Sequence, residues 1–148
     1  MTTNSYVAKV IQEIIKKIKT VSDVTKYMGN RIYPAYISTI QDVTYPAISI
    51  NVLPSEGKSI DDAGMQTIDM DIDFWFKSGI DANSHTWDNV MECKQAVLNE
   101  LHNNGGWDNI VGINVLMMDS ISDGPQAFEQ DTKIMRYQLR FRTRGSLQ

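Results

Sequence analysis

The chain has 148 residues, 42% of them apolar, one cysteine and a formal net charge of −4. A chain of this length has the usual size of one domain, and its apolar share can fill a core without a disulfide or a metal. The negative charge argues against a protein that grips nucleic acid over its whole surface, because such proteins carry excess Lys and Arg.

The longest apolar runs, such as Val115 to Met118, are far shorter than the roughly 20 residues that cross a membrane. Lys16, Lys17 and Lys19 follow the first apolar positions instead of preceding an apolar block, so no secretory signal is expected. The single Cys93 suits a reducing compartment. These features predict a protein made in the cytoplasm and without a membrane partner.

The first part of the chain predicts two helices and an extended piece. Apolar residues recur at helical spacing from Val7 to Ile18, with Asn4 or Ser5 as the N-cap. A shorter helix is expected from Ser22 or Asp23, as N-cap, to about Met28, with Gly29 as its stop. The segment 31–34 then reads as extended, and its proline keeps it from continuing as a central strand.

Two segments alternate with the period of two that is typical of strands. Residues 45–53 predict a half-buried strand, followed by a polar loop over 54–64. Residues 67–76 are the most regular segment of the chain. One face carries Ile68, Met70, Ile72, Phe74 and Phe76, and the other carries Thr67, Asp69, Asp71, Asp73 and Trp75.

The second part repeats the order of helix and strand pair. A helix is predicted from Asn83 or Ser84 to about His102, with Trp87 in its buried stripe and Lys94 facing away. A strand follows over 111–119, and a loop over 121–130 contains the expected turn 123–125. The inner face of the strand over 111–119 is expected to be Ile113, Val115 and Met117. The last strand, 132–143, places Met135, Tyr137, Leu139 and Phe141 inside and Ile134, Arg136, Gln138, Arg140 and Arg142 outside.

These elements predict one α+β domain over residues 1–148. Its sheet is antiparallel or mixed, has four strands or more, and carries two main helices on one face in the order α-β-β-α-β-β.

The three aspartates on one strand face are the strongest chemical feature. Asp69, Asp71 and Asp73 could bind Mg²⁺ or Ca²⁺, but no His pair or Gly-turned loop accompanies them. The arginines at 136, 140 and 142 alternate in the same way, so acidic and basic faces could instead pair across strands or subunits. A solvated charged face is the third interpretation.

The remaining candidates for chemistry carry no motif. His85 and His102 are too far apart to share one helix face. Cys93 and a histidine could meet in space as a nucleophilic pair, although a small residue packed in a helix is the better interpretation. We therefore predict no catalytic residue, no cofactor and no metal. Trp75, on an otherwise polar face, indicates either a protein contact or a side chain covered within the monomer.

Taken in order, these segments resemble the tail-terminator, or tail-completion, proteins of long-tailed bacteriophages. The resemblance spans nearly the whole chain. It is carried by the first helix, Arg31-Ile32-Tyr33-Pro34, Tyr45-Pro46-Ala47-Ile48-Ser49-Ile50, the acidic strand, the helix ending Val97-Leu98-Asn99-Glu100-Leu101 and the basic strand near 136–144.

The resemblance implies a non-enzymatic virion protein that is assembled in the host cytoplasm and located in the tail or neck. It implies a homohexameric ring that caps the tail tube, ends tube polymerisation and joins a head-closure or neck protein, while DNA passes through without specific binding. The candidate residues for the subunit interface or the lumen are Asp69, Asp71, Asp73, Trp75, Arg136, Arg140 and Arg142.

Three other functions fit the same sequence. The chain could be another neck component of the head–tail connection, such as a head-closure or adaptor protein. It could be a small metal-dependent nuclease that uses the acidic strand, or a monomeric ligand-binding domain.

Overall fold

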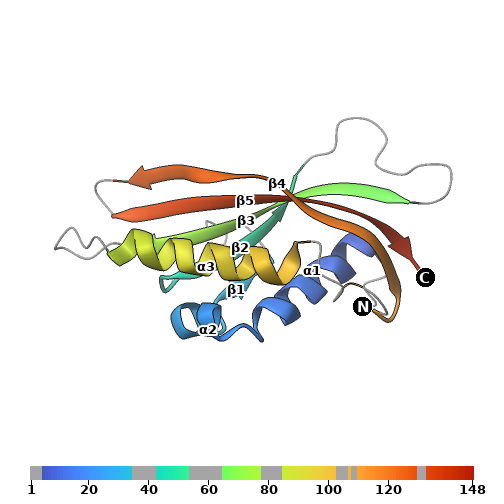
Figure 1. Cartoon of the computed structure of the whole chain (residues 1–148), viewed down its shortest axis with the longest axis horizontal. Helices are drawn as coiled ribbons and strands as arrows, with labels where there is room; N and C mark the ends of the chain where they lie inside the picture. The colour runs from blue at the N-terminus through green and yellow to red at the C-terminus, as the bar shows by residue number, and fades with distance from the viewer. Residues whose placement is uncertain are drawn as a thin grey trace.

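The computed structural model describes residues 5–34, 43–53, 65–77, 85–102, 107, 110–129 and 133–148, the side chains of 85–87 and 125–129 excepted. These residues form three helices and five strands (Figure 1). The elements are α1 (Tyr6–Ile18), α2 (Ser22–Met28), β1 (Ile32–Tyr33), β2 (Ala47–Val52), β3 (Gln66–Lys77), α3 (His85–Leu101), β4 (Ile113–Glu129) and β5 (Ile134–Leu147).

The strands form one mixed sheet in the order β1-β2-β3-β5-β4. The short β1 runs parallel to β2, and the other neighbours are antiparallel. The α+β class is therefore confirmed. The predicted order of six elements was incomplete, because it did not count α2 as a main helix and took β1 only as an extended piece.

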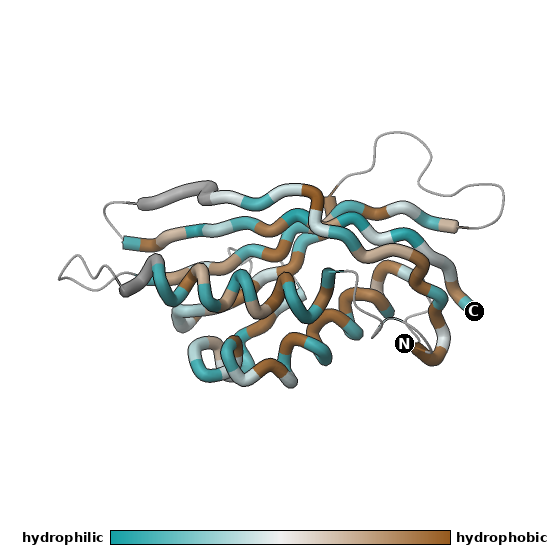
Figure 2. The backbone as a smooth tube through the Cα atoms, in the orientation of Figure 1, coloured by the Kyte–Doolittle hydropathy of each residue, from teal (hydrophilic) through white to brown (hydrophobic). Residues whose placement is uncertain are grey.

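The helices lie together on one face of the sheet (Figure 1). Helix α1 buries Tyr6, Val10, Ile14 and Ile18, one residue per turn, and the Ser5 side chain accepts a hydrogen bond from the Ala8 amide at 3.3 Å. The predicted apolar face of β3 lies in the same core, together with Tyr137, Leu139 and Phe141 of β5. Figure 2 shows the alternation of hydropathy along these strands. We call the face that carries the helices the inner face of the sheet and the opposite one the outer face.

Helix α2 ends as predicted but begins differently. Gly29 stops it with a φ of +56°, a conformation that glycine adopts without strain. Its N-cap is Val21, so the prediction of Ser22 or Asp23 was wrong. Asp23 instead lies in the first turn, where a carboxylate favours the positive end of the helix dipole.

Strand β4 departs most from the prediction. It continues through 123–125 to Glu129. The predicted turn was therefore wrong, and so was the predicted loop over residues 121–129. The pairing with β5 shifts register between Val115 and Met117. This bulge adds a residue to β4, so Met118 is buried and Met117 is not on the inner face as predicted.

Helix α3 agrees with the predicted segment and differs in one side chain. Lys94 does not face away from the sheet. Its ammonium group lies 3.1 Å from the Asp123 carboxylate of β4 and 5.9 Å from the centre of the Tyr137 ring. The predicted cap at Asn83 or Ser84 and the loop 54–64 lie outside the described residues, as does the Trp87 side chain.

Within the described part of the chain, none of the helices has the length and apolar character needed to cross a membrane.

Gly145 of β5 allows a close approach that predicts a stability effect. A Cβ atom there would lie 2.2 Å from the Asn114 carbonyl oxygen and 2.5 Å from the Tyr6 hydroxyl. Gly145→Ala should therefore lower the free energy of unfolding by about 1–3 kcal/mol or more in urea denaturation. Gly124→Ala is the matched control, because a Cβ there meets nothing within 4 Å. Equal stability of the two variants would contradict this packing.

Candidate functional site: a ladder of ion pairs on the outer face

The pairing of β3 with β5 brings together the acidic and basic residues that the sequence separates widely. Asp69 lies opposite Arg142, Asp71 opposite Arg140, Asp73 opposite Gln138 and Trp75 opposite Arg136. All of these side chains belong to the outer face, because the apolar residues between them point to the helices. All seven candidate residues predicted for this region therefore lie on one face of the sheet, on two paired strands.

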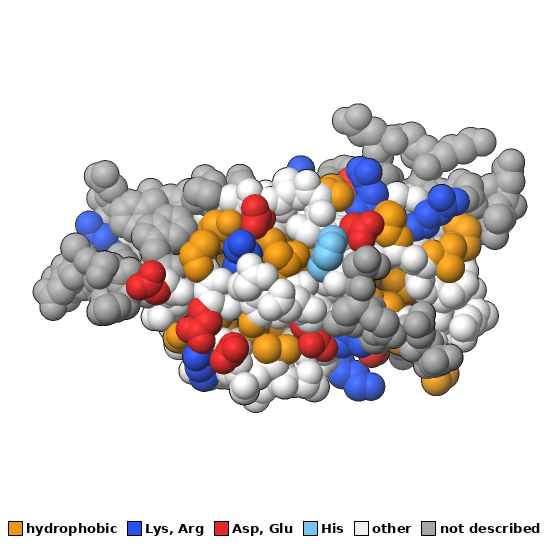
Figure 3. All heavy atoms as spheres, in the orientation of Figure 1, with side chains coloured by type: hydrophobic (Ala, Val, Ile, Leu, Met, Phe, Trp, Pro, Cys, Tyr) orange, Lys and Arg blue, Asp and Glu red, His pale blue; other side chains and the backbone are white. Residues whose placement is uncertain are grey.

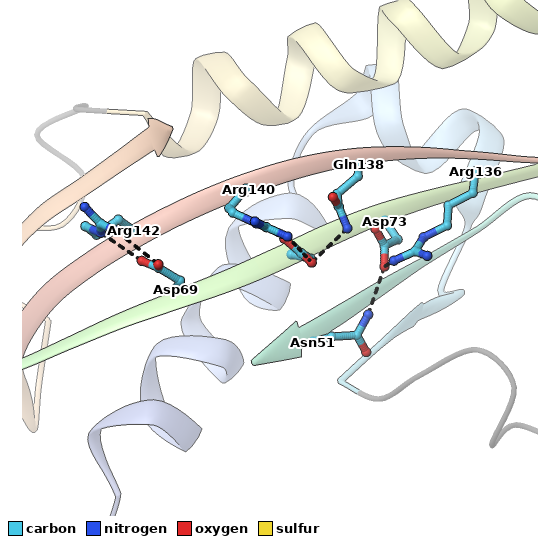
Figure 4. A network of polar contacts seen from close by, with 8 residues as sticks. Asn51, Asp69, Asp73, Arg136, Gln138, Arg140 and Arg142 are labelled. Carbon is cyan, nitrogen blue, oxygen red and sulfur yellow. Dashed lines mark hydrogen bonds and ion pairs between the residues drawn. The ribbon is translucent and has the colours of Figure 1, made fainter. Parts of the chain in front are cut away.

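Three ion pairs connect the two strands (Figure 4). The Arg142 guanidinium donates to both carboxylate oxygens of Asp69, at 2.9 and 3.1 Å, and that of Arg140 donates to both oxygens of Asp71, at 2.8 and 3.3 Å. Arg136 donates to Oδ2 of Asp73 at 3.0 Å. Within one chain, then, the acidic and basic faces pair across strands. We call these three pairs the ion-pair ladder.

Burial increases along the ladder. The side chains of Asp69 and Arg142 are 31% and 47% exposed, whereas Asp71 is 5% and Asp73 0% exposed. Ser49 and Asn51 of β2 are also buried on the outer face. The interpretation of a solvated charged face was therefore wrong for Asp71 and Asp73, and β2 is buried on both faces instead of half-buried.

The buried end of the ladder is not fully hydrogen-bonded. Oδ2 of Asp73 accepts from Asn51 at 2.9 Å as well as from Arg136. Among the described residues, Oδ1 of Asp73, Oδ1 of Asn51 and Nε of Arg136 are buried without a hydrogen-bond partner. Burial raises the pKa of Asp73, and the adjacent Arg136 opposes this rise. The buried end thus carries an electrostatic cost.

Trp75 is held by contacts within the chain. Its indole nitrogen donates to the Ser49 hydroxyl at 2.9 Å, and the Arg136 guanidinium lies 5.3 Å from its ring centre. The side chain is partly buried. These contacts explain how a large aromatic residue is accommodated on a polar face.

The ladder gives no support to the metal-dependent nuclease. Each of the three carboxylates already accepts hydrogen bonds from a guanidinium group, and a cation would have to approach against that positive charge. In the described ranges, no group of three His, Cys, Asp or Glu side chains could hold a metal ion.

Cys93 and His102 do not form a nucleophilic pair. Burial raises the pKa of the Cys93 thiol to about 12, which keeps it protonated at neutral pH. Its sulfur lies 3.7 Å from the Asp23 carbonyl oxygen, so it packs between α3 and α2. His102 instead accepts a hydrogen bond at Nδ1 from the Ser120 amide at 3.0 Å.

Sequence reasoning missed several buried residues that support this arrangement. Tyr6 is fully buried and shares a 2.8 Å hydrogen bond with Thr143 of β5. Trp107 is buried and donates to the Leu101 carbonyl at 2.9 Å. Gln138 donates to Asp71 at 2.8 Å. Tyr6 has a detectable signal, since it lies one turn before Val10 on the predicted apolar stripe.

These features define an α+β fold with helices on one face of a mixed sheet and paired charges on the other. The chain shares this fold with a chain in the solved structure of the virion of a native gene transfer agent particle. The TM-score is 0.67 and the identity 16%, and the match covers 95% of this chain and 98% of that one. No family profile and no curated protein matches the sequence.

The ladder predicts unequal costs for removing its carboxylates. Asp73→Ala leaves Arg136 without its partner in a mostly buried place and should lower the free energy of unfolding by about 2–4 kcal/mol. Asp69→Ala breaks an exposed pair and should cost about 0–1 kcal/mol. Urea denaturation of the two variants checks this order. Similar losses would show that burial does not set the strength of these pairs.

The packing of Cys93 predicts an unreactive thiol. In the native protein at pH 8, modification by a thiol reagent such as 5,5′-dithiobis(2-nitrobenzoic acid) should be slower by several orders of magnitude than in urea, because so little thiolate is present and the sulfur is buried. Rapid native labelling would contradict both the burial and the raised pKa, and would reopen the nucleophile interpretation.

Proposed function

We propose that this chain is a structural virion protein and, within that class, a tail terminator. The observation that carries the proposal is the fold shared over nearly the full length of both chains with a component of a virion particle. The sequence resemblance to tail-terminator proteins is a separate argument for the same class. Neither argument depends on the chemistry of a single residue.

In this role the subunits form a hexameric ring that closes the end of the tail tube. The ring stops the addition of tube protein and offers its other side to a head-closure or neck protein, and DNA passes through its centre without specific binding. The protein is assembled in the host cytoplasm and becomes part of the tail or neck of the particle.

Ring closure requires two different complementary patches on each subunit. The acidic and basic strand faces satisfy each other inside the chain, so the ladder residues are less available for this contact than the sequence suggested. Strand β4 offers another surface. Leu116 is 64% and Ile121 42% exposed, and both are the extra residues where the register shifts on this edge strand. Exposed apolar side chains on a sheet edge favour protein contact.

The surface chemistry agrees with an assembly protein that stays soluble until it meets its partners. Figure 3 shows acidic and basic side chains interspersed over the side on which α3 lies. Such mixing avoids a large field of one sign and limits unspecific binding.

The test is the mass of the purified chain by light scattering over a concentration series, with and without tail tube protein. We expect a species of roughly six times the 16.8 kDa of one chain, either alone or once tube ends are added. Leu116→Ser should weaken this assembly, and Gln12→Ser on the exposed side of α1 serves as the control.

Other outcomes would redirect the proposal. A chain that ignores tube ends but binds the isolated head-closure or portal complex is a different neck component. A strict monomer that responds to neither surface contradicts a role in the particle and leaves the monomeric ligand-binding domain as the better interpretation.

A further inference from the structure

Strand β5 carries a row of four arginines on the outer face of the sheet. The row consists of Arg136, Arg140, Arg142 and Arg144. The last three occupy alternate positions, so neighbours among them lie about 7 Å apart along the strand, and Arg136 lies four residues before Arg140. Four cations in a line form a surface that would attract a polyanion if nothing opposed them. We call these residues the arginine row.

Carboxylates flank the row from both neighbouring strands. Asp69 and Asp71 of β3 each hold one guanidinium through two hydrogen bonds. Asp119 of β4 lies directly opposite Arg142 and thus on the same face. The hydrogen bond to Asp71 raises the pKa of Arg140 and that to Asp69 raises the pKa of Arg142, because each carboxylate stabilises the cation.

This pairing occupies the donors that would otherwise bind phosphate. A guanidinium presents its N–H groups as a fork that fits a carboxylate or a phosphate equally well. Since Asp69 and Asp71 already accept from these forks, a passing phosphate must compete with a carboxylate that is held in place by the strand. This part of the face has no net charge from its arginines and aspartates, because it carries three of each. They are the arginines at 140, 142 and 144 and the aspartates at 69, 71 and 119.

The unburied end of the ladder is accessible to a large partner. The side chains of Arg140 and Arg142 are 37% and 47% exposed and that of Asp69 is 31% exposed. The helices occupy the opposite face of the sheet (Figure 1), so a polymer that meets the sheet meets it on the outer face.

From this geometry we propose that the exposed end of the outer face of β3, β5 and β4 lies toward passing DNA, and that Asp69, Asp71 and Asp119 keep its arginines from gripping the phosphates. The inference rests on the proposed function. It assigns the lumen to a surface of paired charges, which neither binds DNA firmly nor repels it as a purely acidic surface would.

The test measures what happens when the carboxylates are neutralised in the full chain. Asp69→Asn combined with Asp119→Asn should bind a 25-base-pair duplex at least tenfold more tightly than the wild type at about 50 mM salt, measured by fluorescence anisotropy. The logarithm of the affinity should fall more steeply with the logarithm of salt concentration, by about 0.9 for each additional phosphate that the variant neutralises. Adding Arg142→Gln should reverse the increase in affinity.

The matched control removes the same two charges elsewhere. Asp23→Asn with Glu92→Gln alters carboxylates on α2 and α3 and leaves the outer face unchanged, so its affinity for the duplex should rise far less. If the double variant of the outer face does not fold, Asp69→Asn alone replaces it, since Asp69 is the most exposed carboxylate of the ladder.

The proposal is overturned if the affinity of the outer-face variant rises no more than that of the control, or if the wild type already binds duplex DNA as tightly. A ring that forms normally while the variant binds DNA no better refutes the lumen assignment and leaves the terminator proposal intact. Tighter DNA binding by a variant chain that never assembles supports the proposal that the aspartates keep the arginines from binding phosphates. The same result counts against the terminator role.

Discussion

The long antiparallel pairing of β3 with β5 is the constraint on which the rest of the structure depends. It runs from Gln66 opposite Gly145 to Lys77 opposite Ile134. Because side chains alternate between faces, this register sends one apolar set to the helices and one charged set to the outer face. A slip by one residue would bury the aspartates among the helices and expose the core. The ion pairs oppose such a slip, since a shift by one residue would turn the aspartates away from the arginines.

The sequence predicted well the elements whose pattern is set locally. The alternation over 67–76 and the helical spacing from Val7 to Ile18 each leave one possible period, and both elements were found. The prediction failed where tertiary pairing overrides local signals. In β4 the residues 123–125 have turn composition but continue as strand, because β5 supplies a partner along the whole length. Bulges then change which of Met117 and Met118 faces the core.

The candidate site shows the same division. The types and spacing of Asp69, Asp71 and Asp73 are visible in the sequence, whereas their burial is not. Burial depends on partners 63 to 73 positions away, such as Arg136 and Arg142, and on β2, which brings Asn51 to Asp73. An isolated strand would expose all three carboxylates. The polar residue Gln138 has its role only because register placed it between two acidic side chains.

Stability alone does not explain why the outer face is built from paired charges. Exposed pairs contribute little, and buried pairs often stabilise less than apolar residues of the same volume. Thr or Ser at these positions would give a neutral face without the cost that the unpartnered oxygen of Asp73 reveals. What paired charges supply in addition is resistance to a one-residue slip, and a surface whose neutrality depends on geometry. Near a polyanion, such a surface stays neutral while each guanidinium remains bound to its own carboxylate, and this condition links the fold of β3 and β5 to the proposed passage of DNA.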